Sequence, residues 1–278
     1  MTNPLAQYYR SPKLYVKLPS KCVFYPQGMV DTTINGEVAV HAMTALDQIN
    51  IRTPDALLNG DAMVKVVGNC VPSIKNPKDL VEPDINTLLL AIRIATVGSQ
   101  MEVDTICPSC SHENHYQIDL NAIIETQTFS EANNCVELDD NLRVHLRPYN
   151  FNQRNLSLLN EVQESQAVSL IQNDSNLDQT TKFMSLGQHV AKMAERTFDI
   201  VAQSITHITI LKTGQTVDNQ EWIAEFLKNI SKSQADSITD KIKQINKVGI
   251  DTVNNFECSS CNHKWQQPID FDPSSFFG

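Results

Sequence analysis

The sequence lacks most of what a catalyst, a membrane protein or an exported protein shows in its primary structure. It contains neither a Gly-rich phosphate-binding loop nor a G-x-S-x-G motif, which mark nucleotide-binding and serine-hydrolase sites. Its longest apolar run, residues 88–92, is far shorter than the roughly eighteen residues of a membrane span. The first residues, MTNPLAQYYRSPK, lack the apolar middle region of a signal peptide. We therefore expect neither a membrane protein nor a secreted one.

Positive charge is also scarce. The 278 residues include 22 Lys and Arg against 32 Asp and Glu, which gives a formal charge of −10 and a pI near 5.1. Phosphate backbones and anionic membranes attract clustered basic residues, so this balance has the wrong sign for either. The densest basic stretch, residues 228–247, is interrupted by Asp236 and Asp240, which is typical of a solvated helix face. We expect no nucleic acid and no membrane among the partners.

The seven cysteines do not form the even set of a secreted disulfide framework. Four of them make two CxxC pairs, and this usage indicates folding in a reducing compartment. Three others have no partner at metal spacing and are expected to be small, buried or partly buried apolar residues, namely Cys22, Cys70 and Cys135.

Turn and capping signals divide the chain into short elements. Four prolines among residues 1–36 predict edge strands or an extended arm there. Helices are predicted to start at Thr44, to run from Thr53 toward Gly68, and to follow Asp84 through residues 85–97 up to Gly98. The remaining predictions are a hairpin over 136–146, two helices within 150–203, a strand over 206–213 ending at Gly214, and helices opened by capping boxes at 218–221 and 233–236, the second ending at Gly249.

One stretch of the sequence occurs twice. Residues 107–120 read CPSCSHENHYQIDL, and residues 258–271, which begin 151 positions later, read CSSCNHKWQQPIDF. Aligned without a gap, the two copies share Cys, Ser, Cys and His, followed by Ile-Asp. Strand-like residues flank each CxxC, so each copy is predicted to be a hairpin whose turn points two sulfurs the same way.

Two such turns fit one structural zinc ion. A structural site takes four ligands in a tetrahedron, and one CxxC turn supplies only half of them. We therefore predict a zinc ribbon whose two halves are separated by 147 residues. The alternatives are a redox dithiol, two incomplete sites completed by another chain, or cysteines that only pack. A thioredoxin-like dithiol should open a helix, whereas strand-like residues follow both copies. The predicted ligands are Cys107, Cys110, Cys258 and Cys261.

The histidines near these cysteines allow two interpretations. His112 and His263 occupy equivalent places just after each CxxC, where they either replace a sulfur in the metal shell or serve the turn beside the thiolates, and the pattern favours the turn. The string SHENH is superficially similar to a metalloprotease motif. It fails as one because His112 and His115 are three apart in a hairpin, not four apart on a helix.

These patterns together predict an α+β fold, predominantly helical, with short hairpins and a zinc ribbon assembled from two distant CxxC hairpins. Three regions are expected. They are an α+β region with an extended arm and the first CxxC turn, or knuckle (1–148), a mainly helical region (149–249), and a C-terminal hairpin whose CxxC knuckle packs back on the first (250–278).

Several segments carry a family resemblance. They are LPSKCVFYPQG at 18–28, MTALDQ at 43–48, LLNGDAMVKVV at 57–67, LLLAIRIATVGSQMEV at 88–103, LRPYNF at 146–151 and FDPSSFF at 271–277. Together they resemble the baseplate hub subunit family of T-even-like contractile-tailed bacteriophages. The match is spread over most of the chain and is weakest over residues 150–203. One departure is Cys22, which stands after LPSK where the family pattern has glycine. The resemblance therefore does not predict the conformation of the turn at this position.

The resemblance implies a structural component of the tail baseplate in its hub region, a zinc-stabilised adaptor that docks other baseplate and tail proteins, in several copies per baseplate. It would be made and assembled in the host cytoplasm. The resemblance brings no catalytic residues, and the four knuckle cysteines are the functional set carried over. Two alternatives stay open, a baseplate assembly chaperone absent from the virion and a zinc-ribbon nucleic-acid-binding protein. A metal-dependent enzyme would need an open coordination position, which four cysteines do not leave.

Overall fold

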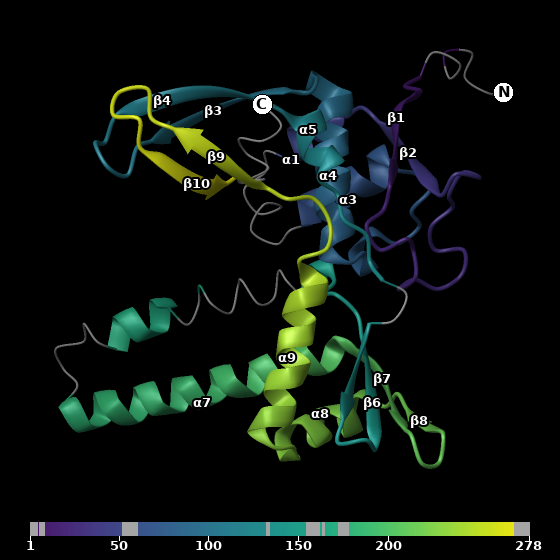
Figure 1. The fold of residues 1–278 in the computed structure, drawn as a ribbon, viewed down its shortest axis with the longest axis vertical. Coiled ribbons are helices and arrows are strands. Elements are labelled where there is room, and N and C mark those ends of the chain that lie inside the picture. The colour runs from purple at the N-terminus through teal and green to yellow at the C-terminus, as the bar shows by residue number, and fades with distance from the viewer. Residues whose placement is uncertain are drawn as a thin grey trace. The chain divides into compact units, whose positions relative to one another are not determined.

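The computed structural model describes residues 5, 9–51, 61–131, 134–153, 162, 165–171 and 178–269. The chain divides into unit 1, Met1–Ser130 with Val248–Gly278, and unit 2, Glu131–Lys247. Unit 2 is therefore an insertion in the sequence of unit 1. Residues 131–148 belong to unit 2, and the last hairpin belongs to unit 1. Figure 1 shows the helices and strands of both units.

Unit 1 combines three two-stranded antiparallel sheets, β1–β2, β3–β4 and β9–β10, with a group of helices. Its elements are β1 (Pro12–Lys17), β2 (Glu37–His41), α1 (Ala45–Ile51), α3 (Asp61–Cys70), the 3-10 helix η2 (Pro77–Asp79), α4 (Glu82–Val97), β3 (Gln100–Ile106), β4 (Glu113–Asp119), α5 (Leu120–Glu125), β9 (Val253–Glu257) and β10 (Lys264–Pro268).

Unit 2 holds one four-stranded antiparallel sheet in the order β5-β6-β7-β8, packed with helices. Its elements are β5 (Cys135–Leu138), β6 (Leu142–Leu146), α7 (Gln179–Gln203), β7 (Ile205–Ile210), β8 (Gln215–Val217), α8 (Gln220–Asn229) and α9 (Lys232–Asn246). The α+β class is thus confirmed. The ten strands of the described residues give the chain a larger β component than the prediction of a mainly helical protein.

Helix α4 is the core of unit 1, as its apolar sequence predicts. Nearly all of its side chains from Pro83 to Ile92 are buried, and Gly98 ends it at a φ of 99°. The predicted start at Asp84 is wrong, because the N-cap is Val81 and Pro83 stands in the first turn. The Asp84 carboxylate is instead used elsewhere.

Asp84 ties the loop after β1 to the start of α4. Its carboxylate accepts hydrogen bonds from the Ser20 N–H (2.8 Å), the Ser20 hydroxyl (2.5 Å) and the Tyr25 hydroxyl (2.6 Å). The Tyr25 oxygen in turn accepts from the Val81 N–H at 2.9 Å. A buried carboxylate needs such partners because it has lost its water. The loop that the family resemblance singled out is therefore anchored by a buried hydrogen-bond network.

The predicted start at Thr44 is confirmed. The Thr44 hydroxyl and N–H both donate to the Asp47 carboxylate at 2.8 Å, and the Asp47 N–H donates back to the Thr44 oxygen at 3.2 Å. Helix α3 continues through Gly68 to Cys70, two residues beyond its predicted end. The predicted start at Thr53 lies outside the described residues.

The core of unit 2 forms between the inner face of the sheet and the apolar faces of its helices. The predicted hairpin is present as β5–β6, and in the three-residue loop between the paired Leu138 and Leu142, Asp139 and Asp140 have φ of 49° and 53°. The core side chains are Leu138, Val144, Leu146, Val201, Ala202, Ile205, Ile208, Ile223, Leu227, Ile238, Ile242 and Ile245. Residues 165–171 and α7 account for the two helices predicted within 150–203, among the residues described there.

Two local predictions in unit 2 are wrong in detail, and one strand is missed. Asn219 caps α8 by accepting from the Trp222 N–H, one residue after the predicted box. The capping box of α9 is formed by Ser231 and Gln234, two residues before the predicted one. In both cases a second polar residue close by offered equivalent capping chemistry, and packing of the helix decided between them. Strand β8, too short for an alternation signal, was not predicted.

Residue Gly249 does not end α9, which stops at Asn246. It forms a two-way bridge with Thr128, with the Thr128 N–H donating to the Gly249 oxygen at 2.8 Å and the reverse bond at 3.2 Å. The bridge joins the chain just before it leaves unit 1 to the chain just after it returns. Among the described residues, no helix has both the length and the apolar character that crossing a membrane requires.

Candidate metal centre

The two CxxC segments form the turns of two hairpins, β3–β4 and β9–β10, which lie next to each other in unit 1 (Figure 1). The last strand pairs before the turns are Ile106 with Glu113 and Glu257 with Lys264. Each turn therefore spans six residues, 107–112 and 258–263. The prediction of two CxxC hairpins is confirmed.

The two turns have the same backbone conformation. In the first, the Cys107 N–H donates to the His112 oxygen at 2.9 Å, the Ser111 N–H donates to the Cys107 oxygen at 2.9 Å, and Ser111 has a φ of 58°. The Ser109 N–H also points at the Cys107 sulfur, 3.4 Å away. The second turn repeats this set with Cys258 N–H to His263 oxygen (2.9 Å), Asn262 N–H to Cys258 oxygen (3.0 Å), Ser260 N–H to Cys258 sulfur (3.4 Å) and a φ of 57° at Asn262.

The turns bring the four cysteine sulfurs into one cluster. All four lie within 4.8 Å of one another, and the sulfurs are 3.7 Å apart for Cys107 and Cys261 and 3.6 Å apart for Cys110 and Cys258. Disulfide sulfurs would lie about 2.05 Å apart. Four sulfurs bound about 2.3 Å from one zinc ion in a tetrahedron lie roughly 3.8 Å from each other. The donor set thus fits a four-thiolate zinc ion in number, chemistry and spacing.

Without a cation, the four sulfurs disturb one another's ionisation. Burial raises the pKa of Cys258, but the N–H groups of Cys261 and Ser260, together with neighbouring sulfurs, lower it to about 6. The His112 N–H lowers the pKa of Cys110, yet the Cys261 sulfur, burial and the other sulfurs raise it to about 12. One sulfur thus sheds its proton while its neighbour keeps one. A divalent cation removes this conflict because it stabilises every thiolate together.

Asn114 joins the first hairpin to the second turn. Its side chain is buried, its Nδ2 donates to the His112 oxygen at 3.0 Å, and its Oδ1 accepts from both the N–H and the hydroxyl of Ser259 at 3.0 Å. The equivalent of Ser259 in the first turn is Pro108, which has no N–H to give. The duplicated site is therefore asymmetric, and sequence reasoning missed Asn114 because the two copies differ at its position.

Aromatic and polar contacts hold the hairpins together below the sulfurs. The Tyr116 ring lies 4.9 Å from the Phe256 ring and 6.4 Å from the Trp265 ring, and its hydroxyl donates to the Glu257 oxygen at 2.9 Å. Thr105 donates to Gln267 at 2.8 Å across the same interface. Trp265 is half-buried and stacks on Phe256, so it covers the ribbon.

The nearby histidines lie around the cluster. His112 and His263 are exposed, and their backbone oxygens close the turns, while the sulfur cluster in the described residues contains cysteines alone. His115 lies on β4, and its Nδ1 contacts the exposed Asp104 carboxylate at 2.6 Å. The remaining cysteines lie outside the cluster. Burial, with smaller contributions from Asp84 and Asp47 respectively, raises the pKa of Cys22 and Cys70 to about 11, although Arg10 lowers that of Cys70 in part.

Fold and cluster together define the chain as an α+β protein that carries a four-cysteine ribbon. The chain belongs to the T4 bacteriophage base plate protein family, whose model matches residues 40–278 and so spans both hairpins and both units. The resemblance to T4-like baseplate proteins is confirmed at this level, and membership gives the protein a place in the virion tail baseplate among other phage tail proteins. Comparisons with curated proteins and with solved structures returned no match.

Proposed function

We propose that this protein is a structural component of the baseplate hub, a zinc-stabilised adaptor that docks other tail proteins and performs no catalysis. The family match supports the baseplate. The sequence segments that resemble the hub subunit family support the hub, and the protein would be made and assembled in the host cytoplasm. The observation that carries the adaptor role is the cluster of four sulfurs, which joins residues 151 positions apart in sequence.

A metal is needed because the hairpins are too small to be stable alone. An isolated two-stranded hairpin is at best marginally stable in water, and β3–β4 and β9–β10 are both of this kind. A structural zinc ion contributes on the order of 10 kcal/mol or more of apparent binding free energy. With four cysteine ligands the shell is closed, which suits a structural ion and leaves no position for a substrate. The ribbon then behaves as one rigid part on which partner proteins can dock.

Metal analysis of the purified full chain tests the zinc ribbon. We expect one zinc ion per chain by mass spectrometry of the metal, and loss of that ion together with earlier thermal unfolding in Cys258→Ser. The matched control is Cys22→Ser, which removes a thiol of the same unit outside the cluster and should keep the zinc. Equal metal content and equal melting of Cys258→Ser and the wild-type chain would contradict the ribbon.

The hub role requires a second experiment. Baseplates and whole virions purified from infected cells should contain the chain, and protein cross-linking should join it to hub proteins. A chain that is required for assembly but missing from virions would make it a chaperone instead. Salt-sensitive binding of the purified chain to duplex DNA would favour a nucleic-acid-binding zinc ribbon, and the acidic composition predicts no such binding.

A further inference from the structure

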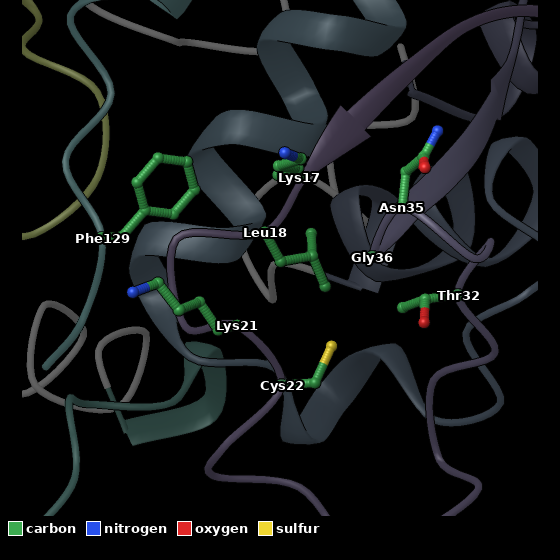
Figure 2. Close-up of a pocket in the computed structure, with 8 residues that line it drawn as sticks. All are labelled: Lys17, Leu18, Lys21, Cys22, Thr32, Asn35, Gly36 and Phe129. Atoms are coloured by element: carbon green, nitrogen blue, oxygen red, sulfur yellow. The ribbon is translucent and has the colours of Figure 1, made fainter. Parts of the chain in front are cut away.

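A pocket of about 370 Å³ lies beside the loop that follows β1 in unit 1. Figure 2 shows Phe129 and Lys21 on one side and Thr32 and Asn35 on the other, with Leu18 between them. The full lining is Lys17, Leu18, Lys21, Cys22, Thr32, Asn35, Gly36 and Phe129. The volume falls at the lower end of the range of ligand sites, which is about 300–1,000 Å³. None of these residues belongs to the cluster of four cysteine sulfurs.

The pocket carries two positive charges without a carboxylate in its lining. Lys17 and Lys21 are both exposed, and neither forms an ion pair with any residue the structure describes. Glu37 is the cross-strand neighbour of Lys17, yet it neither pairs with it nor lines the pocket. The Lys21 ammonium lies 5.7 Å from the centre of the Phe129 ring, which orients this charge but does not neutralise it. In a chain of net charge −10, such a pair selects for an anion.

The backbone at this pocket is held in an unfavourable conformation. Lys21 and Cys22 have φ of 51° and 61°, a left-handed pair that residues with a Cβ avoid. Ser20 holds the turn, because its hydroxyl accepts from the Cys22 N–H at 3.0 Å and its own groups donate to Asp84. Both strained residues send their side chains into the pocket wall. Backbone strain that the surrounding structure enforces is concentrated at binding and functional sites.

The other walls indicate what accompanies the anion. The Phe129 ring supplies exposed apolar surface and the Leu18 side chain is buried in the wall, while Thr32 and Asn35 supply a hydroxyl and an amide for hydrogen bonds. No arginine lines the pocket, and it is not at the start of a helix, so the usual phosphate-binding devices are missing from its lining. The Cys22 thiol stays protonated at neutral pH, since burial and the nearby Asp84 raise its pKa to about 11.

We propose that this pocket binds an acidic peptide segment of a partner protein, with a carboxylate between Lys17 and Lys21 and a neighbouring apolar side chain against the Phe129 ring. The choice of a peptide rests on the proposed adaptor function, in which the partners are other tail proteins. Electrostatic attraction would speed docking, and contact with the Phe129 ring would hold the segment in register. Charge and apolar surface thus make the pocket a docking point separate from the metal ribbon.

Fluorescence anisotropy of a labelled peptide with alternating Glu and Leu or Phe residues, titrated with the full chain, tests the pocket. We expect saturable binding that weakens as salt rises, and at least a tenfold loss of affinity for Lys17→Gln/Lys21→Gln and for a peptide with Gln in place of Glu. Lys13→Gln, on the same strand outside the pocket, should bind within about twofold of the wild-type chain. All variants should keep the wild-type circular dichroism and melting, because these lysines are exposed.

Three results would overturn the proposal. They are equal binding of the Gln peptide, unchanged affinity of the double variant, and binding of inorganic phosphate in preference to the peptide. Because the assay needs only the purified chain and a synthetic peptide, it is independent of whether the protein is found in baseplates. A failure of the pocket is therefore distinguishable from a failure of the hub assignment.

Discussion

Replacing Asp84 by asparagine should make the chain more stable at neutral pH. The Asp84 side chain is fully buried, and burial raises its pKa from 3.8 to about 6, although bonds from Ser20 and Tyr25 lower it in part. A folded carboxyl with a raised pKa contributes its full stability below pH ~4, where both the folded and the unfolded chain are protonated. That contribution is lost as the pH rises through about 6, because the folded chain must then hold a buried charge.

The magnitude follows from the shift. About two pKa units at 1.36 kcal/mol each correspond to a loss of about 3 kcal/mol in the free energy of unfolding between pH ~4 and pH ~7. Asparagine has the same shape and no charge. Its oxygen can accept from the Ser20 N–H, while its amide can donate to the oxygens of the Ser20 and Tyr25 hydroxyls. We therefore expect Asp84→Asn to match the wild type near pH 4 and to exceed it by about 1 to 3 kcal/mol above pH 6.

The two tryptophans make the measurement selective. Trp265 lies in unit 1 and Trp222 in unit 2, so in a Trp222→Phe background the remaining fluorescence reports on the unit that contains Asp84. Urea unfolding across this pH range gives the free energies. Asp79→Asn, which removes an exposed carboxylate of the same unit, is the matched control. If the free energy of unfolding of the wild type does not change from pH ~4 to ~7 and Asp84→Asn is less stable at every pH, the charged carboxylate is a net stabiliser and the reasoning fails.

Three further changes should have measurable effects. Asn114→Ala should lower the free energy of unfolding by about 1 to 3 kcal/mol and should release zinc more readily in competition with a chelator. Asn255→Ala, which changes an exposed residue of β9, should have neither effect. Equal zinc affinity of the two variants would contradict the role of Asn114 in joining the first hairpin to the second turn. Gly249→Ala should lower the melting temperature through a loss of about 2 kcal/mol or more, because φ is +116° and the new Cβ would lie 3.2 Å from Pro83; an unchanged melting curve would refute this. Burial, a stacked histidine and an arginine on the same strand lower the pKa of His145, so unit 2 should lose stability as the pH falls below about 6.5, and His145→Gln should reduce that loss in urea unfolding followed by Trp222 fluorescence. A wild-type urea midpoint that does not move between pH ~7.5 and ~5.5 would disprove the role of His145.

The structural features that the sequence predicts correctly are those in which a residue type has one distinctive physical role. Two CxxC pairs with matching flanks predicted two hairpins, and their sulfurs meet as expected. The apolar run of α4 predicted a buried helix, and Gly98 predicted its end. These features depend on local spacing and on residues whose backbone or ligand chemistry is distinctive, so one sequence is enough to recognise them.

The rest could not be predicted because it depends on contacts between distant residues. The position of Asp84 before an apolar run predicts a helix start there, but Ser20, which is far away in sequence, donates to its carboxylate instead. The role of Asn114 requires knowing that Ser259 lies beside it, and nothing in the repeat indicates this. Lys21 and Cys22 adopt left-handed backbone despite their side chains, since tertiary anchoring overrides local preference.

The sequence separation of the two knuckles also determines how long after the first cysteine pair the second one is synthesised. Cys107 leaves the ribosome 151 residues before Cys258, which at about 5 to 20 residues per second means a delay of roughly 8 to 30 s. During that interval all of unit 2 can emerge and fold, while the first hairpin waits with half of its ligands. The part of the protein made first is then completed last. Any chain cut short by premature termination before Cys258 would lack two of the four cysteines of the cluster, so the proposed metal site could close only after synthesis has passed the second CxxC turn.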